Sequence, residues 1–544
     1  MKKHTWALVV LGASIFGLSA CDNDLTEVPK SFIAPENLYT DAAGALAALN
    51  GAYAAFQADV SDLGIDDDDY YGRHYWMLVE YPTETMTLRL GATNERTQPD
   101  IFRVDPGHGY ILGVWRAAFH GVNRANSVID NVPNIKNMDA KLRERIVAEA
   151  KVLRAYHYFN LVRFFGGVPL YLEETRSLED IRKPRAPEAE VYQAIIKDLT
   201  DAAAVLPASY TGGNVGRATS GAARALLAKV NLQYGAIGGG GAAAYQQAEK
   251  WAREVVSSGR YRLLPNYADI FDQNNENNQE VIFDIQNAPS PGAGGYLCDQ
   301  LAPRPQPDRN AFPWCDSQNP SFGAEWPFFF SYDPNDKRKA ATWLLSYTKK
   351  NGEVTRWDST HVQASLYGHF APVPQKYIDK NPAALNGAED PNFILVRYAD
   401  VLLSLAEAIN ETAGPTAEAY SLVNQVRNRA GLGNLTPGLS KQAFKDALFL
   451  ERRFELVGEG HGHFDSQRNW DWAERRIEAN ATDAARAFWN RPTPRNCRAQ
   501  GTTCISLNRN VPPVTIDVRE YHKYYPIPQD VRAVNPLLTQ NPGY

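Results

Sequence analysis

The most constraining feature of this chain is a set of paired segments with helical spacing of apolar residues. One pair covers residues 398–412 and 416–430, and glycine or proline ends each segment. With its closing Gly431 this pair spans 34 residues, and a second pair, over residues 220–257, spans 38. Helix pairs of this length cannot bury their apolar faces alone, so we expect them to stack on neighbouring pairs.

A period of 34 residues is that of tetratricopeptide repeats, which are helix pairs that stack into a superhelix. Two further segments have the same helical pattern, one over residues 141–165 and one that starts at Ser440 and runs toward Leu456. The sequence therefore predicts an all-α scaffold of tetratricopeptide-like helix pairs.

Two long segments interrupt this helical pattern. Residues 289–377 are rich in Pro, Gly, Asn and aromatic residues and have little helical periodicity, and residues 59–98 are similar. Long irregular segments within a regular scaffold are usually functional. We therefore expect the binding site to lie in these two insertions.

The first 20 residues have the pattern of a lipoprotein signal peptide. Lys2 and Lys3 precede an apolar stretch at residues 6–18, and the small residues Ser19 and Ala20 lead directly into Cys21. We expect cleavage before Cys21 and acylation of this cysteine, which would anchor the protein in a membrane. The alternative is an ordinary secretory signal followed by a coincidental cysteine.

Charge and cysteine content narrow the class of protein further. The formal net charge of −6 disfavours nucleic acid as a partner. Four cysteines remain after Cys21, an even number that suits an oxidising compartment. We favour the pairs Cys298–Cys315 and Cys497–Cys504, because each closes a short loop; free buried thiols are the alternative.

Several motifs occur in a characteristic order along the chain. They lie at residues 148–159 with 164–170, at 333–338, at 397–408, at 451–453 with 464–465, and in the ending at 526–528 and 535–544. Through these motifs the chain resembles the SusD/RagB family of outer-membrane lipoproteins, from the signal peptide to the last residue. Together they are far more specific than any one of them alone.

The resemblance implies an all-α fold of about four tetratricopeptide-like units packed against an irregular, loop-rich, ligand-binding half. After the signal peptide at residues 1–20, it implies an N-terminal region at 21–285 and a C-terminal region at 286–544. It further implies a non-catalytic lipoprotein on the outer face of the outer membrane. Such proteins capture a nutrient, usually a glycan, and deliver it to a SusC-like TonB-dependent transporter.

Aromatic residues in the two insertions are the candidates for sugar binding. Tyr and Trp rings offer flat, rigid faces to the C–H face of a sugar ring. In starch-binding members of the family, aromatic residues from these two regions form an arc. By position we expect ligand contacts from Trp76, Tyr296, Trp314 and Trp326. Polar partners are expected among Arg73, Asn94, Asp299 and Arg309.

Other functions remain open. RagB-type members bind peptides on the same scaffold, and the motifs do not separate the two branches. A glycan hydrolase needs two suitably spaced carboxylates, which a sequence cannot exclude. His461, His463 and Asp465 could suggest zinc, and the four aspartates at residues 66–69 could suggest a structural Ca²⁺, but neither group has a typical ligand spacing. We expect no cofactor and no catalytic residue.

Overall fold

The computed structural model describes residues 38–57, 68–88, 94–177, 180–290, 293–303, 312–314, 322–356, 372–381, 388–481, 497–500, 503–506 and 516–544. Within these ranges the chain is mainly helical, with a few short strands, which confirms the predicted fold class. Cys21, Asp66, Arg309 and Cys315 lie outside the described residues. The predicted division at residue 285 stays a prediction, and one hydrophobic core extends across it.

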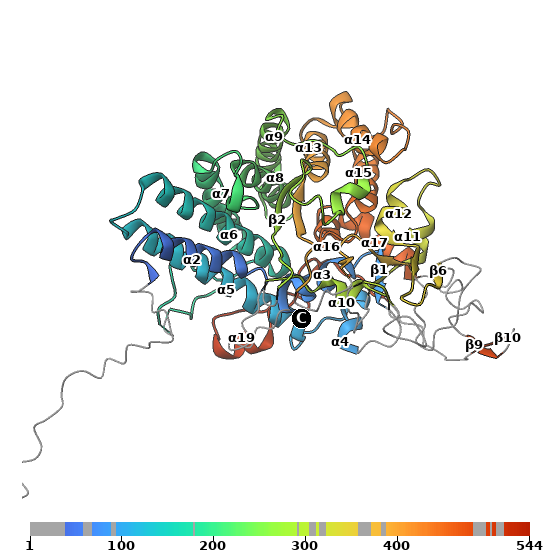
Figure 1. Cartoon of the computed structure of the whole chain (residues 1–544), viewed down its shortest axis with the longest axis horizontal. Coiled ribbons are helices and arrows are strands. Elements are labelled where there is room, and N and C mark those ends of the chain that lie inside the picture. The colour runs from blue at the N-terminus through green and yellow to red at the C-terminus, as the bar shows by residue number, and fades with distance from the viewer. Residues whose placement is uncertain are drawn as a thin grey trace, which may run out of the picture.

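Long helices form the scaffold, and each packs on the next along the chain. Figure 1 shows them as a row that runs from α2 and α5 at one end to α14 and α15 at the other. The helices of this row are α2 (Ala42–Ala54), α5 (Gly109–Asn131), α6 (Ala140–Phe165), α7 (Glu188–Val205), α8 (Ser220–Ala236), α9 (Gly241–Ser257), α13 (Tyr398–Ala413), α14 (Ala417–Arg429) and α15 (Lys441–Leu456). Helix α9 packs directly on α13, so the chain between them is a long excursion from the helical scaffold.

Local capping explains why these helices begin and end where they do. The side chains of Thr416 and Ser440 accept the backbone N–H groups of Ala419 and Ala443, both at 3.2 Å. Such N-caps satisfy donors that have no partner inside the helix. At the C-terminal end of α13, Gly414 has a φ of 84°, a left-handed value that favours glycine.

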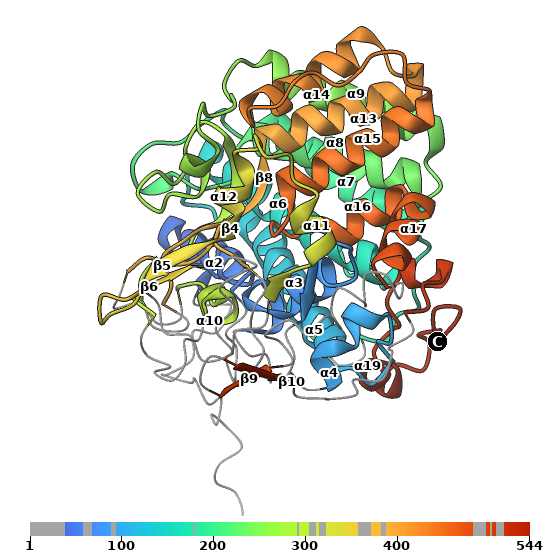
Figure 2. The same ribbon diagram turned by 90° about the vertical axis from the view of Figure 1, so that its right-hand side faces the viewer.

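Short elements occupy the region between the scaffold helices and beside them (Figure 2). The short helices are α3 (His74–Glu80), α4 (Asn94–Thr97), α10 (Leu297–Leu301), α11 (Trp326–Phe330), α12 (Arg338–Thr342), α16 (Gly462–Arg468), α17 (Trp470–Ala481) and α19 (Gln529–Val534). The strands pair as β1 (Met86–Leu88) with β3 (Phe322–Ala324), β2 (Val281–Ile285) with β8 (Phe393–Arg397), β4 (Trp343–Leu344) with β7 (Val373–Pro374), β5 (Ser346–Thr348) with β6 (Val354–Arg356), and β9 (Cys497–Gln500) with β10 (Thr503–Ser506). Every pair is antiparallel. The β1–β3 pair joins the first sequence insertion to the second.

Three of the four cysteines in the predicted disulfides lie in described parts of the chain. Cys298 lies in α10, is fully buried and is disulfide-bonded. In the β9–β10 hairpin, Cys504 lies opposite Ala499 and Cys497 opposite Ser506, so the two cysteines are close in register. The Cys497–Cys504 pair stays a prediction.

A buried cluster of charged side chains holds β8 against the scaffold. Arg397 donates hydrogen bonds to Glu455 at 2.6 Å and to Glu459 at 2.6 and 2.9 Å. Burial by itself would raise the pKa of Glu455, but the nearby guanidinium groups of Arg429 and Arg397 hold it well below its usual range. We call this cluster the Arg397 network; its members are Glu280, Arg338, Lys376, Arg397, Arg429, Glu451, Glu455 and Glu459.

None of the helices in the described ranges is long and apolar enough to cross a lipid bilayer.

Candidate functional site

The two sequence insertions meet at one pocket, which encloses about 460 Å³ of empty space, open solvent included. Its lining comes from the end of the first helix, from the segment before α3, from the loop before α10 and from the loop that leads into β8. We call it the Tyr296 pocket; it is lined by Phe56, Gln57, Tyr71, Gly72, Ile285, Asn287, Gly294, Gly295, Tyr296, Leu297, Tyr377, Glu389, Pro391 and Phe393. Segments that are more than 300 residues apart in the chain, such as Phe56 and Phe393, therefore share one site.

Aromatic rings form one wall of this pocket. Phe393 lies between two tyrosines, with its ring centroid 5.3 Å from that of Tyr71 and 5.0 Å from that of Tyr377. Tyr71 in turn stacks on Tyr75 at 4.3 Å. Burial raises the pKa of Tyr71 and of Tyr377 well above the usual value, so both hydroxyls stay protonated. The wall is therefore apolar and rigid, and carries neutral hydroxyl groups.

Amide side chains hold the loop before α10 in place. The Nε2 group of Gln57 lies within hydrogen-bond distance of Ala293 O (2.8 Å), Asn287 Oδ1 (3.1 Å) and Gln286 O (3.2 Å). Asn287 in turn donates from Nδ2 to Pro391 O at 2.7 Å. These bonds connect the chain just after α2, the loop before α10 and the loop before β8.

The backbone of the same loop makes a close approach that requires glycine. Gly295 and Glu389 form an antiparallel bridge, with Gly295 N donating to Glu389 O at 2.8 Å. A Cβ atom on Gly294 would lie 2.3 Å from the Cα of Ala388, which no packing of a side chain could accommodate. The carboxylate of Glu389 accepts the backbone N–H of Cys298 at 2.7 Å and so fixes the start of α10.

The predicted site residues are distributed over different places. Tyr296 is half-buried and lines the pocket, directly before α10. Trp314 is half-buried and lies outside the pocket lining; its ring packs edge-on against Phe312 at 5.3 Å. Arg73 precedes α3 and lies over the ring of Tyr110 at 5.9 Å, also outside the lining.

Trp76 does not have the surface position that we expected. It lies in α3 with 0% of its side chain exposed, and Phe322 of β3 packs edge-on against it at 4.4 Å. Because a fully buried ring cannot stack on a ligand, the expectation of a sugar contact at Trp76 is wrong. The ring is a core residue that joins α3 to the β1–β3 pair.

The other predicted positions cannot be placed in the site. Trp326 begins α11 and Asn94 begins α4, but neither side chain belongs to the described part of the structure, nor does that of Asp299 in α10. Arg309 lies outside the described residues. Ligand contacts at Tyr296, Trp314, Trp326, Arg73 and Arg309 stay predictions.

Sequence reasoning missed several residues that form the pocket. Gln57 lies just before the first insertion, and Glu389 and Phe393 lie beyond the second. The only local signal is the tandem Gly294-Gly295 next to an aromatic residue, which is typical of close backbone approach. The pairing of this loop with Glu389 is a long-range contact without a local pattern.

Metal binding receives no support from the described residues, among which no three or more His, Cys, Asp or Glu side chains are grouped to hold an ion. His461 and His463 face different partners. Nδ1 of His461 lies 3.2 Å from Lys229 Nζ, and Nε2 of His463 lies 3.2 Å from Lys523 O. Residues 66 and 67 of the acidic run are not described, so the Ca²⁺ prediction stays untested.

Comparison with known proteins gives relatives over most of the chain. The chain is 28% identical over 499 residues to SusD-like protein P2 of Formosa agariphila, which covers 86% of this chain and 91% of that one. It is 27% identical over 446 residues to the starch-binding protein SusD of Bacteroides thetaiotaomicron, covering 72% and 76%. Among solved structures, a laminarin-binding SusD-like protein matches with a TM-score of 0.68 and 25% identity, covering 92% of this chain and 99% of that one.

Two family models match the sequence. The model described as starch-binding and associating with the outer membrane matches residues 49–232. The model of the SusD family matches residues 253–544, more than half of the chain. With the helical scaffold and these matches together, the chain belongs to the SusD family.

Proposed function

We propose that this protein captures oligosaccharides at the bacterial cell surface and passes them to a SusC-like TonB-dependent transporter, without catalysing a reaction. The Tyr296 pocket is the proposed capture site. The starch-binding and laminarin-binding relatives support a glycan as the ligand.

The observation that carries this proposal is the chemistry of the pocket. The half-buried ring of Tyr296 lines the pocket beside a base of buried aromatic rings, and the amide side chains of Gln57 and Asn287 line it as well. Sugars need both kinds of surface, because their C–H faces pack on aromatic rings while their hydroxyls require planar hydrogen-bonding partners. Tyr296 is half-buried, so its ring is accessible to a ligand.

The remaining parts of the proposal concern location and partner. Acylated Cys21 would hold the protein on the outer membrane, facing the exterior, where the ligand is present. The membership in the SusD family supports a transporter partner. Co-purification of a TonB-dependent barrel with this protein from detergent extracts of native membranes tests the partnership, and isolation of the free protein alone would contradict it.

Calorimetric titration of the detergent-solubilised protein tests the capture role. The ligands are laminarihexaose, maltohexaose, xylohexaose and a tryptic peptide mixture. We expect one of the neutral oligosaccharides to bind, and Tyr296→Ala to weaken that binding by about 1–3 kcal/mol, the usual loss for a central aromatic anchor. The matched control is Tyr521→Ala, at a tyrosine that is 38% exposed and outside the pocket.

Three outcomes would contradict the proposal. Binding of peptides with no response to any glycan would place this chain with the RagB-type peptide binders. Release of reducing ends from a bound oligosaccharide would show a hydrolase. Glycan binding that is equally strong in the Tyr296→Ala variant would remove the Tyr296 pocket as the capture site.

A further inference from the structure

A second pocket lies directly beside the Tyr296 pocket. It is formed where the segment after η6 (Tyr267–Phe271) faces β2 and the segment that leads into β8, and it encloses about 300 Å³ of empty space, open solvent included. Tyr377 and Pro391 line both pockets. We call it the acidic pocket; the residues used below are Phe271, Gln273, Glu276, Asp284, Tyr377 and Asn392.

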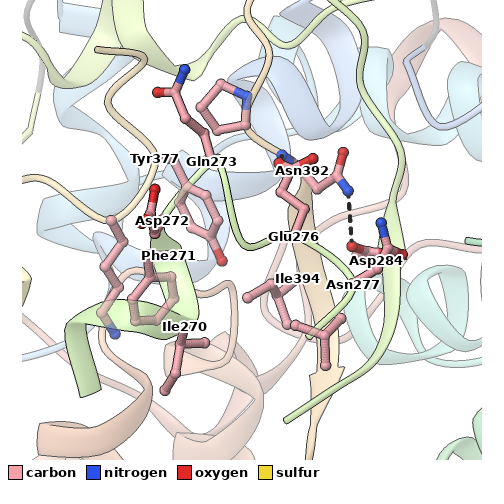
Figure 3. Close-up of a pocket in the computed structure, with 13 residues that line it drawn as sticks. Ile270, Phe271, Asp272, Gln273, Glu276, Asn277, Asp284, Tyr377, Asn392 and Ile394 are labelled. Carbon is pink, nitrogen blue, oxygen red and sulfur yellow. Dashed lines mark hydrogen bonds between the residues drawn. The ribbon is translucent and has the colours of Figure 1, made fainter. Parts of the chain in front are cut away.

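The hydroxyl of Tyr377 is the first sign that this pocket holds a ligand. The side chain is only 3% exposed, and its hydroxyl makes no well-formed hydrogen bond among the described residues, while the backbone of Ile394 lies near it and offsets part of the burial effect on its pKa. Figure 3 shows this hydroxyl directed into the space between Phe271, Glu276 and Ile394. A buried hydroxyl with so weak a partner is costly, so a hydrogen bond to a water or to a ligand hydroxyl in the pocket would stabilise it.

Two carboxylates are held in fixed positions on the other side of this space. Glu276 Oε1 accepts the backbone N–H of Asn392 at 2.6 Å, and Asp284 Oδ2 accepts the side-chain amide of Asn392 at 3.1 Å. Figure 3 shows the bond between Asn392 and Asp284. The described residues give no partner for Oε2 of Glu276, so this oxygen can accept a hydrogen bond from a ligand.

The charge of the pocket limits which ligand can enter. Burial raises the pKa of Glu276 to about 7 and that of Asp284 to about 6, and Asp284, Asp390 and Asp379 add to the rise at Glu276. The ammonium of Lys376, which also lines the pocket, is already bound by Glu459 Oε1 at 2.6 Å and by Glu455 O at 3.2 Å. A uronate or sulfate group would therefore meet several carboxylates and no available cation among the described lining residues.

We propose that the acidic pocket is a second saccharide subsite, continuous with the Tyr296 pocket across Tyr377 and Pro391, which accepts a neutral sugar residue and rejects anionic sugars. The sugar donates a hydroxyl to Glu276 Oε2 and hydrogen-bonds to the hydroxyl of Tyr377. The partly exposed ring of Phe271 provides apolar contact. This inference rests on the proposed function and specifies its substrate class.

Two conservative variants test the subsite in the full-length protein. Glu276→Gln keeps the Oε1 acceptor for Asn392 and removes the charge, and Tyr377→Phe keeps the ring that both pockets share. The ligands are laminarihexaose, maltohexaose, xylohexaose and the anionic hexagalacturonate. We expect each variant to bind the preferred neutral hexasaccharide about tenfold more weakly, the value of one good hydrogen bond. Calorimetric unfolding confirms that both variants fold, and Tyr521→Ala is the control.

A pH profile provides a readout that a structural role would not change. Hydroxyl donors bind an ionised carboxylate, so ligand affinity rises as Glu276 loses its proton. Between pH 6 and pH 8 the ionised fraction of a group with a pKa of about 7 rises about tenfold. The affinity of the wild-type protein should follow this rise, and that of Glu276→Gln should follow it much less. The charged groups around Glu276 are Asp272, Asp284, Lys376, Asp379 and Asp390.

The outcomes separate this inference from the proposed function. If Tyr296→Ala weakens binding while Glu276→Gln and Tyr377→Phe do not, the acidic pocket holds only water and the inference is wrong. Binding of hexagalacturonate as tightly as of the neutral hexasaccharides also overturns it. If the wild-type protein binds none of the oligosaccharides, the proposed function fails and the inference fails with it.

Discussion

The Arg397 network and the Tyr296 pocket lie next to each other and use polar groups in opposite ways. In the network every guanidinium is matched by carboxylates inside the protein, so the charges are fully used in holding β8, α15 and the neighbouring loops. In the pocket, amide groups fix the backbone of loops, while the half-buried ring of Tyr296 stays accessible. The difference separates residues that stabilise the fold from residues that are available to a ligand.

The largest effect is expected from a substitution that breaks the network. Arg397→Met keeps most of the side-chain volume but removes the cation that Glu455 and Glu459 share, and leaves them only their other partners in the network. Because the removal of one partner from a buried ion-pair network is strongly destabilising, the free energy of unfolding should fall by about 3–5 kcal/mol. Urea unfolding followed by circular dichroism measures the change.

The control for this variant is an arginine in an exposed ion pair. Arg253 bonds to Glu249 and Glu418 at the surface, with 42% of its side chain exposed. Arg253→Met should change the free energy of unfolding by less than about 1 kcal/mol. Equal losses for the two variants would mean that the buried network has no special role in stability.

A second comparison uses the two tryptophans that the sequence assigned to the same role. Trp76→Ala removes a fully buried ring that packs on Phe322, so the free energy of unfolding should fall by about 3–5 kcal/mol. Trp314→Ala, at a half-buried ring, should cost less stability. Urea unfolding together with calorimetric titration separates the two effects. A Trp76→Ala protein of normal stability that no longer binds glycan would return Trp76 to the ligand site.

The smallest of these effects concerns the glycine at the edge of the Tyr296 pocket. In Gly294→Ala the new Cβ would overlap the backbone of Ala388, so the loop must shift at a cost of about 1–3 kcal/mol. Gly51 in α2 has open space around it, and Gly51→Ala should stabilise the helix by up to about 1 kcal/mol. Thermal unfolding compares the two. If both variants were equally stable, the close approach of the two loops would be relaxed in solution.

The parts of the fold that sequence reasoning predicted are those with local causes. Apolar periodicity and terminal glycines placed a helix at residues 141–165, and the structure has Ala140–Phe165. In the same way the predicted cap at Ser440 starts α15. Helix periodicity, capping and the tetratricopeptide period are all encoded within a few tens of residues, so no tertiary information was needed.

The site was less predictable because its contacts are long-range. Every residue of α3 from His74 to Glu80 is buried, the polar ones included. The helix therefore has no contrast between a polar and an apolar face that would have marked Trp76 as a core residue. Glu389 and Phe393 lie outside the irregular insertions and reach the site only through the Gly295–Glu389 bridge and the β2–β8 pair. Tyr296 was predicted from its position in the second insertion, and it lines the pocket, while its contact with a ligand stays a prediction.

The β2–β8 pair also suggests how such a protein can acquire a new ligand. Ile285 lies opposite Phe393 in this pair, so the chain that leaves the scaffold after β2 returns to the same place more than 100 residues later. A segment with adjacent ends can be exchanged as a cassette without repositioning the helices on either side. Arg338 and Lys376, which connect the segment to the Arg397 network, are the attachment points that any replacement has to retain. Diversification of specificity can thus proceed within residues 286–392 while the helical frame stays constant.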